Sequence, residues 1–496
     1  MSTKNIEYNE ILIGWAEKDI TPNRSVILFG QFYPRISEVV HDSITVTALV
    51  LTDKNEQAIM VSCDLCEIPP YILDRCREEI HKRIPEIDVS KVILNATHTH
   101  TAPSLLEGVY PPPPDYVMTP TEYADFFVSR VAEAVVEAWN NRAIGAVSWG
   151  FGHAVVGHNR RVVYFDDISL RPGYKSMDGG IIDGTSKMYG DTNDPNFSHI
   201  EGYEDHSVDM LFTWDPTGNL TGIIINLASP SQETEQERYI SADFWSEIRT
   251  EVRKRYGERI FILAQCSSAG DQSPHLLLYK QAEDRMLKLR GLNMREEIGR
   301  RVANAVEDVL PYAQKDIQTT LPFKHMVKII NLKRRLVTEE ELARIKEEYS
   351  RLEKWQTKDP IEESIRFVSM GRCKAIIERY EEQKGQKTLP MELHVIRLGD
   401  IAFATNGFEL FLDYGLRIKA RSPAIQTFIV QLGPGILATT NPYLTGSYLP
   451  TQRAIVGRGY SANVYDNEIG PEGGQELVEH TVKLLSEMWE DTKILD

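Results

Sequence analysis

The stretch KVILNATHTHTAPS (residues 91–104) changes from apolar to polar within a few residues. KVIL is an apolar run of β-branched character and predicts a buried strand, and Pro103 marks the loop beyond it. In an extended chain, residues two apart point to the same face, so His98 and His100 are predicted to approach one point. Because neutral imidazole is the most frequent nitrogen ligand of metals, the pair predicts the beginning of a metal site. The alternative is a polar strand end at the surface.

Strand-like and helical segments alternate along the chain on both sides of this stretch. Further apolar runs occur at 45–51, 58–65, 208–214, 220–229, 259–266, 392–398 and 427–432. Apolar residues recur at i, i+3, i+4 and i+7, the spacing of an amphipathic helix, in the segments 71–84, 122–141, 294–310 and 475–489. Strands interleaved with helices indicate an α/β fold, and we expect layered mixed β-sheets flanked by helices.

One segment differs from the rest in composition. Residues 337–387 are rich in Glu, Lys and Arg, as in TEEELARIKEEYSRLEKW (338–355). This composition predicts a solvated, charged helical hairpin inserted between strands. A lid and a subunit contact in a homo-oligomer are the alternatives to a plain surface excursion. No linker marks a domain boundary, so residues 1–496 are predicted to form a single catalytic domain that contains this insertion.

The charge balance restricts the class of partner. The 496 residues carry 55 Lys and Arg against 72 Asp and Glu, a net charge of −17, which argues against nucleic acid or an anionic membrane as the main partner. The N-terminus MSTKNIEYNEILIGW lacks the basic start and long apolar core of a secretory signal, and no apolar run is long enough to span a bilayer. We therefore expect a cytoplasmic protein that acts on a small molecule, without stable insertion into a membrane.

The cysteines point to the same compartment. Five cysteines, few and odd in number, fit a reducing environment. CDLC (63–66) is a lone C-x-x-C at the end of an apolar run. A redox or zinc role is compatible with it, but packing at a strand end is the favoured interpretation because there is no second pair.

Four further segments carry candidate site residues. QCSSAGDQSPHL (265–276) follows an apolar run and predicts a strand-end loop with many donors for a polar substrate, with a plain turn as the alternative. In GHNRRVVYFDD (157–167), Arg160 suits binding of a carboxylate or an oxyanion, although an exposed salt bridge is equally compatible. In TNGFELFLDYGLRIKARSP (405–423), Glu409 precedes an apparent helix, where the helix dipole also favours an acid. NPYLTGSYLPTQRA (441–454) contributes two tyrosines.

Taken together and in this order, these segments resemble the catalytic domain of the neutral (non-lysosomal) ceramidase family, zinc-dependent amide hydrolases. IGWAEKDITP (13–22) resembles the family's G-x-A-x-x-D-I-T-x-P opening, and NATHTHTAPS resembles its T-H-T-H-S-x-P motif. Asn159-Arg160 resembles its N-R segment, GDQSP (270–274) its G-D-x-S-P motif, and SYLPT (447–451) the end of its tyrosine motif. The resemblance covers essentially the whole chain but not the family's extra C-terminal β-domain.

Position by position, the resemblance implies a set of site residues. His98, Glu409 and Tyr448 match ligands of zinc, or of another divalent metal, and the match at Glu409 requires a one-residue shift in a glycine-flanked turn. His100 and Arg160 would lie beside the metal-bound water, and Ser273 would contact the reacting group. The catalytic residues implied in this way are His100, Arg160, Asp271 and Ser273.

One ligand of the family has no counterpart. The family's second ligand histidine stands in A-x-H-P after a strand, whereas NLASPSQETE (226–235) has Ser229-Pro230 at that place. SADFW (241–245) resembles the S-D-containing stretch that follows in the family, which supports the register. Either another residue supplies the ligand or the metal site has changed, and a carboxylate in place of nitrogen would make the site harder. The candidate replacements are His206, Gln232, Glu233 and Asp243.

The sequence thus predicts a metal-dependent hydrolase that cleaves an amide (N-acyl) bond of a soluble polar substrate with a metal-activated water. An acidic chain with no obvious apolar membrane-docking helix favours such a substrate over ceramide itself. The alternatives are a carbohydrate-active hydrolase or lyase on the same scaffold, and a non-catalytic binding protein that has lost the metal.

Overall fold

The computed structural model describes residues 7–174, 183–433 and 447–490. Within these ranges, nine strands form the main sheet, which is mixed: β6–β7 and β14–β16 are parallel pairs and the other neighbours are antiparallel. In spatial order its strands are β16 (Phe261–Cys266), β14 (Leu220–Leu227), β13 (Ser207–Trp214), β8 (Ala143–His153), β1 (Asn9–Asp19), β5 (Thr45–Thr52), β6 (Gln57–Cys63) and β7 (Val92–Ala96), with β18 (Thr320–Leu321) paired to β1.

A second mixed sheet packs against the first. Its strands, in spatial order, are β19 (Phe323–Lys333), β20 (Thr388–Leu398), β21 (Ile401–Thr405) and β23 (Gln426–Val430). Because successive side chains of a strand point to opposite faces, Leu49 and Leu51 of β5 face this second sheet, while Ala48 and Val50 face the helices. Side chains from both sheets, including Phe403 and Phe428, interdigitate in one buried cluster between them.

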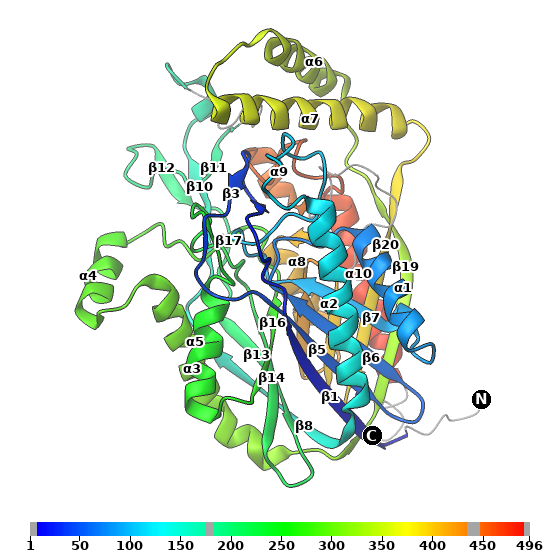
Figure 1. Ribbon diagram of the computed structural model, residues 1–496. Coiled ribbons are helices and arrows are strands. Elements are labelled where there is room, and N and C mark those ends of the chain that lie inside the picture. Colours follow the sequence, from blue (N-terminus) through cyan, green and yellow to red (C-terminus); the bar gives the residue numbers. More distant parts are fainter. Residues whose placement is uncertain (1–6, 175–182, 434–446, 491–496) are drawn as a thin grey trace.

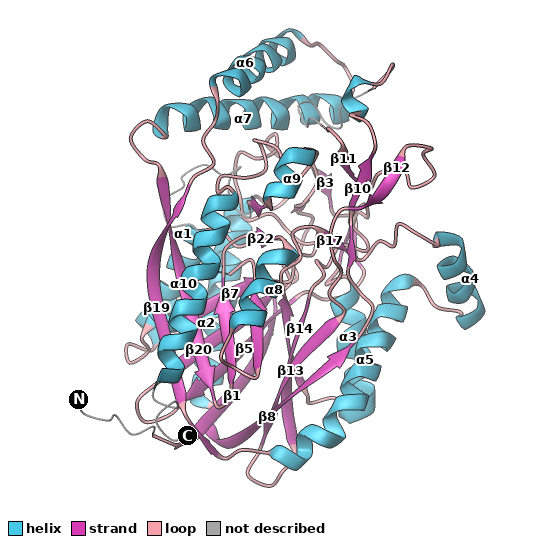
Figure 2. Ribbon diagram, turned by 180° about the vertical axis from the view of Figure 1, so that it is seen from behind, coloured by secondary structure: helices cyan, strands magenta, loops and turns pink. Residues whose placement is uncertain are grey.

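Helices cover the outer face of each sheet, so the molecule has four layers. In the described residues the helices are α1 (Pro70–Arg83), α2 (Pro120–Asn140), α3 (Phe244–Tyr256), α4 (Lys280–Arg290), α5 (Met294–Ala313), α6 (Glu339–Lys354), α7 (Pro360–Glu382), α8 (Leu412–Arg421), α9 (Gln452–Gly457) and α10 (Pro471–Trp489). Helices α1, α2, α3 and α5 cover the main sheet, whereas α8 and α10 cover the second sheet (Figures 1 and 2). The predicted fold of layered mixed sheets flanked by helices is confirmed, as is each strand and helix expected from periodicity.

Helix starts follow from local chemistry. Thr119 caps α2 by accepting a hydrogen bond from the backbone N–H of Glu122, whose side chain in turn accepts from the N–H of Thr119. Pro120 then occupies the first turn, where its missing N–H costs nothing. This capping box satisfies donors that would otherwise have no partner at the helix end.

The charged insertion is a helical hairpin, as predicted. Helices α6 and α7 pack on each other and connect β19 to β20. Thr338 caps α6, and Leu352 and Cys373 form the centre of a small apolar cluster that reaches Tyr465 on the body of the protein. Figure 1 shows α7 lying between α6 and the rest of the molecule, on the side at which β6 and β7 end. The insertion therefore sits over the edge of the sheet at which His98 and His100 emerge.

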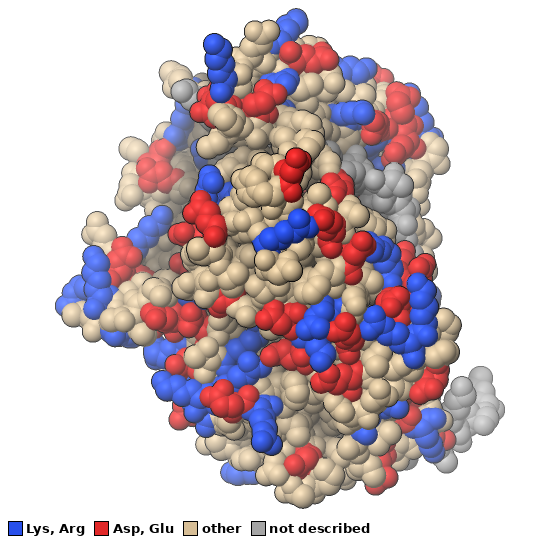
Figure 3. Space-filling model, in the orientation of Figure 1, with Lys and Arg blue, Asp and Glu red and all other residues tan. Residues whose placement is uncertain are grey.

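Short strands hold the loops above that edge. They are β2 (Ile27–Leu28), β3 (Arg35–Ile36), β4 (Val39–Val40), β9 (His158–Asn159), β10 (Arg161–Tyr164), β11 (Ser186–Met188), β12 (Phe197–Ile200), β15 (Tyr239–Ile240), β17 (Gln272–Ser273), β22 (Glu409–Leu410) and β24 (Tyr448–Leu449). Figure 3 shows acidic and basic side chains interspersed over one face of the molecule, without a large field of one sign. None of the helices in the described ranges is long and apolar enough to cross a membrane.

Candidate metal centre

His98 lies just beyond the end of β7 in a left-handed backbone conformation, with φ of 65°. Its N–H donates to the carbonyl of Leu65 at 2.9 Å, and its Nδ1 lies 2.7 Å from the carbonyl oxygen of Cys66. A non-glycine residue keeps this conformation only where its surroundings hold it there. The two histidines do meet, as expected, but the expected cause, an extended chain, is wrong. The two rings meet because the backbone turns at His98.

Two donor groups flank the Nε2 atom of His98. His98 Nε2 lies 3.3 Å from His100 Nε2 and 3.2 Å from Glu409 Oε2. A cation with four tetrahedral ligands at 2.0–2.1 Å separates each pair of ligands by about 3.3 Å, so each of these two distances has the length expected for one pair of ligands. The Cys66 carbonyl can only accept a hydrogen bond, which leaves the Nε2 lone pair of His98 facing the other donors. Imidazole, thiolate and carboxylate are donor types that suit a divalent cation, and the ligand atoms of Cys66, His98 and His100 lie within 4.8 Å of one another.

The electrostatics of His98 also favour a positive charge at this point. Burial alone would lower the pKa of His98, but the Cys66 sulfur and the Glu409 carboxylate outweigh it and hold the pKa well above its usual value. His100 behaves in the opposite way, because burial and the neighbouring His98 and Arg35 lower its pKa well below its usual value. The imidazole of His98 is therefore paired with the Glu409 carboxylate, and the imidazole of His100 is neutral.

His100 is held by close packing on one side and is unpaired on the other. Its ring lies against Gly30, where a methyl group would stand 2.5 Å from the ring Cγ. Its Nδ1 makes no hydrogen bond to a described residue and lies 3.8 Å from Glu235 Oε2. Glu235 accepts a hydrogen bond from Gln232 at 3.0 Å and pairs with His275 at 3.6 Å.

Arg160 joins the segments that carry the predicted ligands. It stands between β9 and β10, is 2% exposed, and donates from Nη2 to Tyr448 Oη and to the Gly270 carbonyl, both at 3.0 Å. The same nitrogen lies 3.9 Å from Glu409 Oε2. Glu409 and Tyr448 are direct neighbours in the parallel pair β22–β24, so His98, Arg160, Glu409 and Tyr448 come together. Glu409 thus belongs to a short strand, and the expected helix, α8, begins at Leu412.

Asp271 and Ser273 lie on the far side of Arg160. Asp271 accepts hydrogen bonds from Asn159 Nδ2 at 2.8 Å and from the N–H of Leu412 at 2.9 Å, and burial raises its pKa to about 6. Ser273 pairs with His158 in the β9–β17 ladder, and its hydroxyl accepts from the N–H of His275. The contacts of Asp271 brace the loop behind Arg160, and the catalytic roles of Asp271 and Ser273 stay predictions.

The candidate replacement ligands are distributed around the site. His206 pairs with Glu204, Glu233 pairs with His275, and Asp243 caps α3 and accepts from Thr234. Gln232 accepts from Arg160 Nη1 at 3.4 Å, and Arg160 in turn lies 3.9 Å from Glu409 Oε2, which connects Gln232 to the donors. Ser229 stands where the family's histidine would be, with its hydroxyl donating to the Pro230 carbonyl. The identity of the replacement stays a prediction.

Cys66 is a site residue that the sequence interpretation assigned to packing. Possible ligand atoms of Cys66, His98 and His100 all lie within 4.8 Å of one another, and the sulfur lies 3.7 Å from His98 Nδ1. CDLC follows the strand β6, which is parallel to β7, so the ends of these neighbouring strands place Cys66 beside His98. The signal was present in the sequence, but only the pairing of β6 with β7 joins the two motifs.

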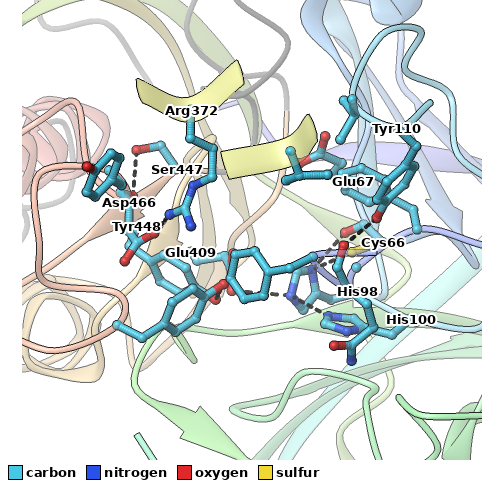
Figure 4. A pocket seen from close by; sticks show the side chains of 18 residues that line it. Cys66, Glu67, His98, His100, Tyr110, Arg372, Glu409, Ser447, Tyr448 and Asp466 are labelled. Carbon is cyan, nitrogen blue, oxygen red and sulfur yellow. Dashed lines mark hydrogen bonds and ion pairs between the residues drawn. The ribbon is translucent and has the colours of Figure 1, made fainter. Parts of the chain in front are cut away.

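The donors open into a cavity of about 140 Å³. Figure 4 shows His98, Glu409 and Tyr448 on its floor, with Arg372 descending from α7 on the opposite side. The cavity is lined by Phe29, Gly30, Gln31, Phe32, Cys66, Glu67, His98, His100, Val109, Tyr110, Val368, Arg372, Glu409, Ser447, Tyr448, Tyr460, Tyr465 and Asp466. Arg372, Tyr460 and Asp466 are further pocket residues that the sequence interpretation missed. Residues 441–446 of the tyrosine-bearing segment lie outside the described residues.

Comparison with known proteins relates this fold to one group of solved structures. No protein-family model and no curated protein matches the sequence. A structure of ceramidase complexed with C2 is similar with a TM-score of 0.63 and 14% identity, covering 97% of this chain and 76% of that chain. Neutral ceramidase from Pseudomonas aeruginosa gives a TM-score of 0.61 and 16% identity over 97% of this chain and 75% of that chain. The chain therefore has the fold of the neutral ceramidases.

Proposed function

We propose that this protein is a metal-dependent hydrolase that cleaves the amide bond of an N-acylated, soluble polar substrate. The observation that carries the proposal is the position of His98 Nε2, which lies 3.3 Å from His100 Nε2 and 3.2 Å from Glu409 Oε2. The likeness of the fold to neutral ceramidases supports the reaction class. Cleavage of a soluble substrate in the cytoplasm is inferred from the composition and the charge of −17.

The metal would be held by His98, Glu409 and Tyr448, with His100 and Cys66 as the nearest further donors. His98 is fixed for this role because its Nδ1 faces the Cys66 carbonyl, which orients Nε2 toward Glu409. When bound, a divalent cation lowers the pKa of a water molecule and polarises a carbonyl group.

The residues beside the donors would handle the proton and the developing charge. Where His100 is a neighbour of the metal and not a ligand, it would accept a proton, because burial lowers its pKa and keeps it neutral, and Glu235, 3.8 Å from Nδ1, would stabilise the resulting imidazolium. Arg160 is held by Gly270 and Tyr448 and would stabilise an oxyanion that forms on the substrate carbonyl. Both groups are buried, where electrostatic interactions are stronger than in water.

The test is the metal content of the purified protein together with the hydrolysis of N-acyl substrates. We expect about one zinc or other divalent ion per chain, and its loss in His98→Ala and Glu409→Gln. Turnover should fall by about 10³-fold or more in both variants because each removes a ligand. His199→Ala is the matched control, since His199 is exposed on β12 and bonds to Ser198. A folded His98→Ala variant that keeps both metal and turnover would contradict the proposal.

A second candidate function is that of a carbohydrate-active hydrolase or lyase on the same scaffold. The four tyrosines of the cavity, Tyr110, Tyr448, Tyr460 and Tyr465, favour it because their hydroxyls can bond to sugar hydroxyls. Release of reducing sugar without cleavage of any N-acyl substrate would favour this candidate. A wild-type protein that binds no metal after incubation with zinc or manganese would instead indicate a non-catalytic binding protein.

A further inference from the structure

The inserted hairpin supplies part of the wall of the candidate catalytic cavity. Val368 and Arg372 of α7 line the same cavity as His98 and Glu409. Val368 is buried in a cluster with Val109 and Tyr110, which come from the loop that follows the histidine pair. The insertion is therefore more than a surface excursion, because its removal would open the cavity opposite the metal donors.

Arg372 places a guanidinium group in this wall. Its Nη2 donates to Asp466, and its head stacks 5.0 Å from the centre of the Phe32 ring and 5.3 Å from that of Tyr465. Among the described residues it makes no second hydrogen bond, so further N–H donors of the fork remain for a ligand. Figure 4 shows this head pointing into the cavity, above Glu409 and Tyr448.

The size of the cavity limits the length of an acyl chain that it can hold. Its volume of about 140 Å³ is small beside the 300–1,000 Å³ of usual ligand pockets. A carboxylate could pair with the free edge of the guanidinium, because Arg can bind anions on more than one edge.

We propose that α7 forms the specificity wall of the site and that Arg372 selects a short acyl group ending in a carboxylate. The inference rests on the proposed function. It narrows the substrate to N-acylated amines whose acyl group comes from a short dicarboxylic acid. The amide would lie at the metal donors and the carboxylate at Arg372. Val368 and Phe32 would limit the length between these two points.

Calorimetric binding of three amides tests the inference without requiring hydrolysis. Butanamide and succinamate have the same carbon number, and only succinamate has a terminal carboxylate; octanamide has a longer alkyl chain. Wild type should bind succinamate at least about tenfold more tightly than butanamide, as a charge-assisted hydrogen bond predicts, and should bind octanamide most weakly. Octanamide bound as tightly as succinamate would overturn the inference.

Variants assign any preference to Arg372. Arg372→Met should remove the preference for succinamate, whereas Arg351→Met should keep it, because Arg351 is 57% exposed on α6 and pairs with Glu348. If loss of the buried pair prevents folding, the double variant Arg372→Met/Asp466→Asn leaves no unpaired carboxylate and serves the same purpose. Retention of the preference in a folded variant without Arg372 would also overturn the inference.

Hydrolysis separates this inference from the proposed function. Cleavage of N-butanoyl amides in preference to N-succinyl amides would overturn the role of Arg372 and support the hydrolase. A preference for succinamate in binding, lost with Arg372 and accompanied by no cleavage of any amide, would support the role of Arg372 and contradict the hydrolase.

Discussion

At the residue scale, the site depends on how closely the backbone of Gly30 approaches His100. Gly30 has φ of +104°, a conformation that a residue with a Cβ rarely adopts, and a methyl group there would lie 2.5 Å from the His100 ring. Because His100 Nε2 lies beside His98 Nε2, any shift of this ring changes the donor set. A glycine far from both histidines in the sequence thus helps to define their geometry.

Gly30→Ala should therefore weaken metal binding by about tenfold or more and lower turnover with it, because the displaced His100 no longer faces the other donors. Gly108→Ala is the control, since Gly108 also has a positive φ, +78°, but nothing lies within 4 Å of an added methyl group. Both variants share the backbone strain of about 1–2 kcal/mol. Metal affinity measured by competition with a chelator separates them, and equal affinities in the two variants would contradict this role of Gly30.

At the element scale, a buried chain of polar side chains ties the second sheet to α1. His325 of β19 contacts His394 of β20 at 3.0 Å, His394 contacts Glu392 at 2.8 Å, and Arg77 of α1 pairs with Glu392 at 2.6 Å. Burial alone would raise the pKa of Glu392, but His394 and Arg77 outweigh it and lower that pKa to about 2. Within the described residues this chain lies outside the candidate metal group.

Because the folded pKa of Glu392 lies below its usual value of 4.5, its ion pair stabilises the fold above pH 4.5. This stabilisation is lost as the pH falls from 4.5 toward 2. Glu392→Gln should lower the free energy of unfolding by about 2 kcal/mol at pH 7, and the difference from wild type should shrink steadily below pH 4.5. Glu79→Gln, which removes a solvent-screened pair with Arg83, should leave the free energy of unfolding nearly unchanged. A difference for Glu392→Gln that does not depend on pH would contradict this explanation.

At the scale of the whole molecule, the candidate metal centre joins two parts of the fold. His98 follows β7 of the main sheet, whereas Glu409 and Tyr448 lie in β22 and β24, which follow β21 and β23 of the second sheet in turn. Arg160 and Asp271 link the same segments through Tyr448 and Leu412. A cation held by residues from both parts would bind the folded chain and not the unfolded one.

Metal binding should for this reason raise the thermal stability of the protein. Free metal at a hundred times its Kd would add about 2.7 kcal/mol to the free energy of unfolding, which corresponds to a rise of a few degrees in Tm. Calorimetry with zinc and with a chelator measures this shift, and His98→Ala should show none. An equal shift in wild type and His98→Ala would place the bound metal elsewhere.

Measurement of the molecular mass in solution would test the predicted homo-oligomer.

The amino-acid sequence by itself determined the elements and most of the candidate ligands. Periodicity of 2 and of 3.6 residues identifies strands and helices because it records which face of each element is buried. The two histidines after an apolar run singled out the motif that contains His98, whereas Glu409 and Tyr448 became candidate ligands through the resemblance to the neutral ceramidase family. The charged composition of residues 337–387 also predicted the helical hairpin.

Only the tertiary structure decided how these parts meet. Cys66 joins His98 because β6 and β7 are parallel neighbours, and Arg372 enters the cavity because α7 crosses the edge of the main sheet. His98 and His100 meet through a left-handed turn that no strand pattern predicts. The physical reason is that local patterns encode burial along one element, whereas the cavity depends on strand order and on packing between residues far apart in the chain.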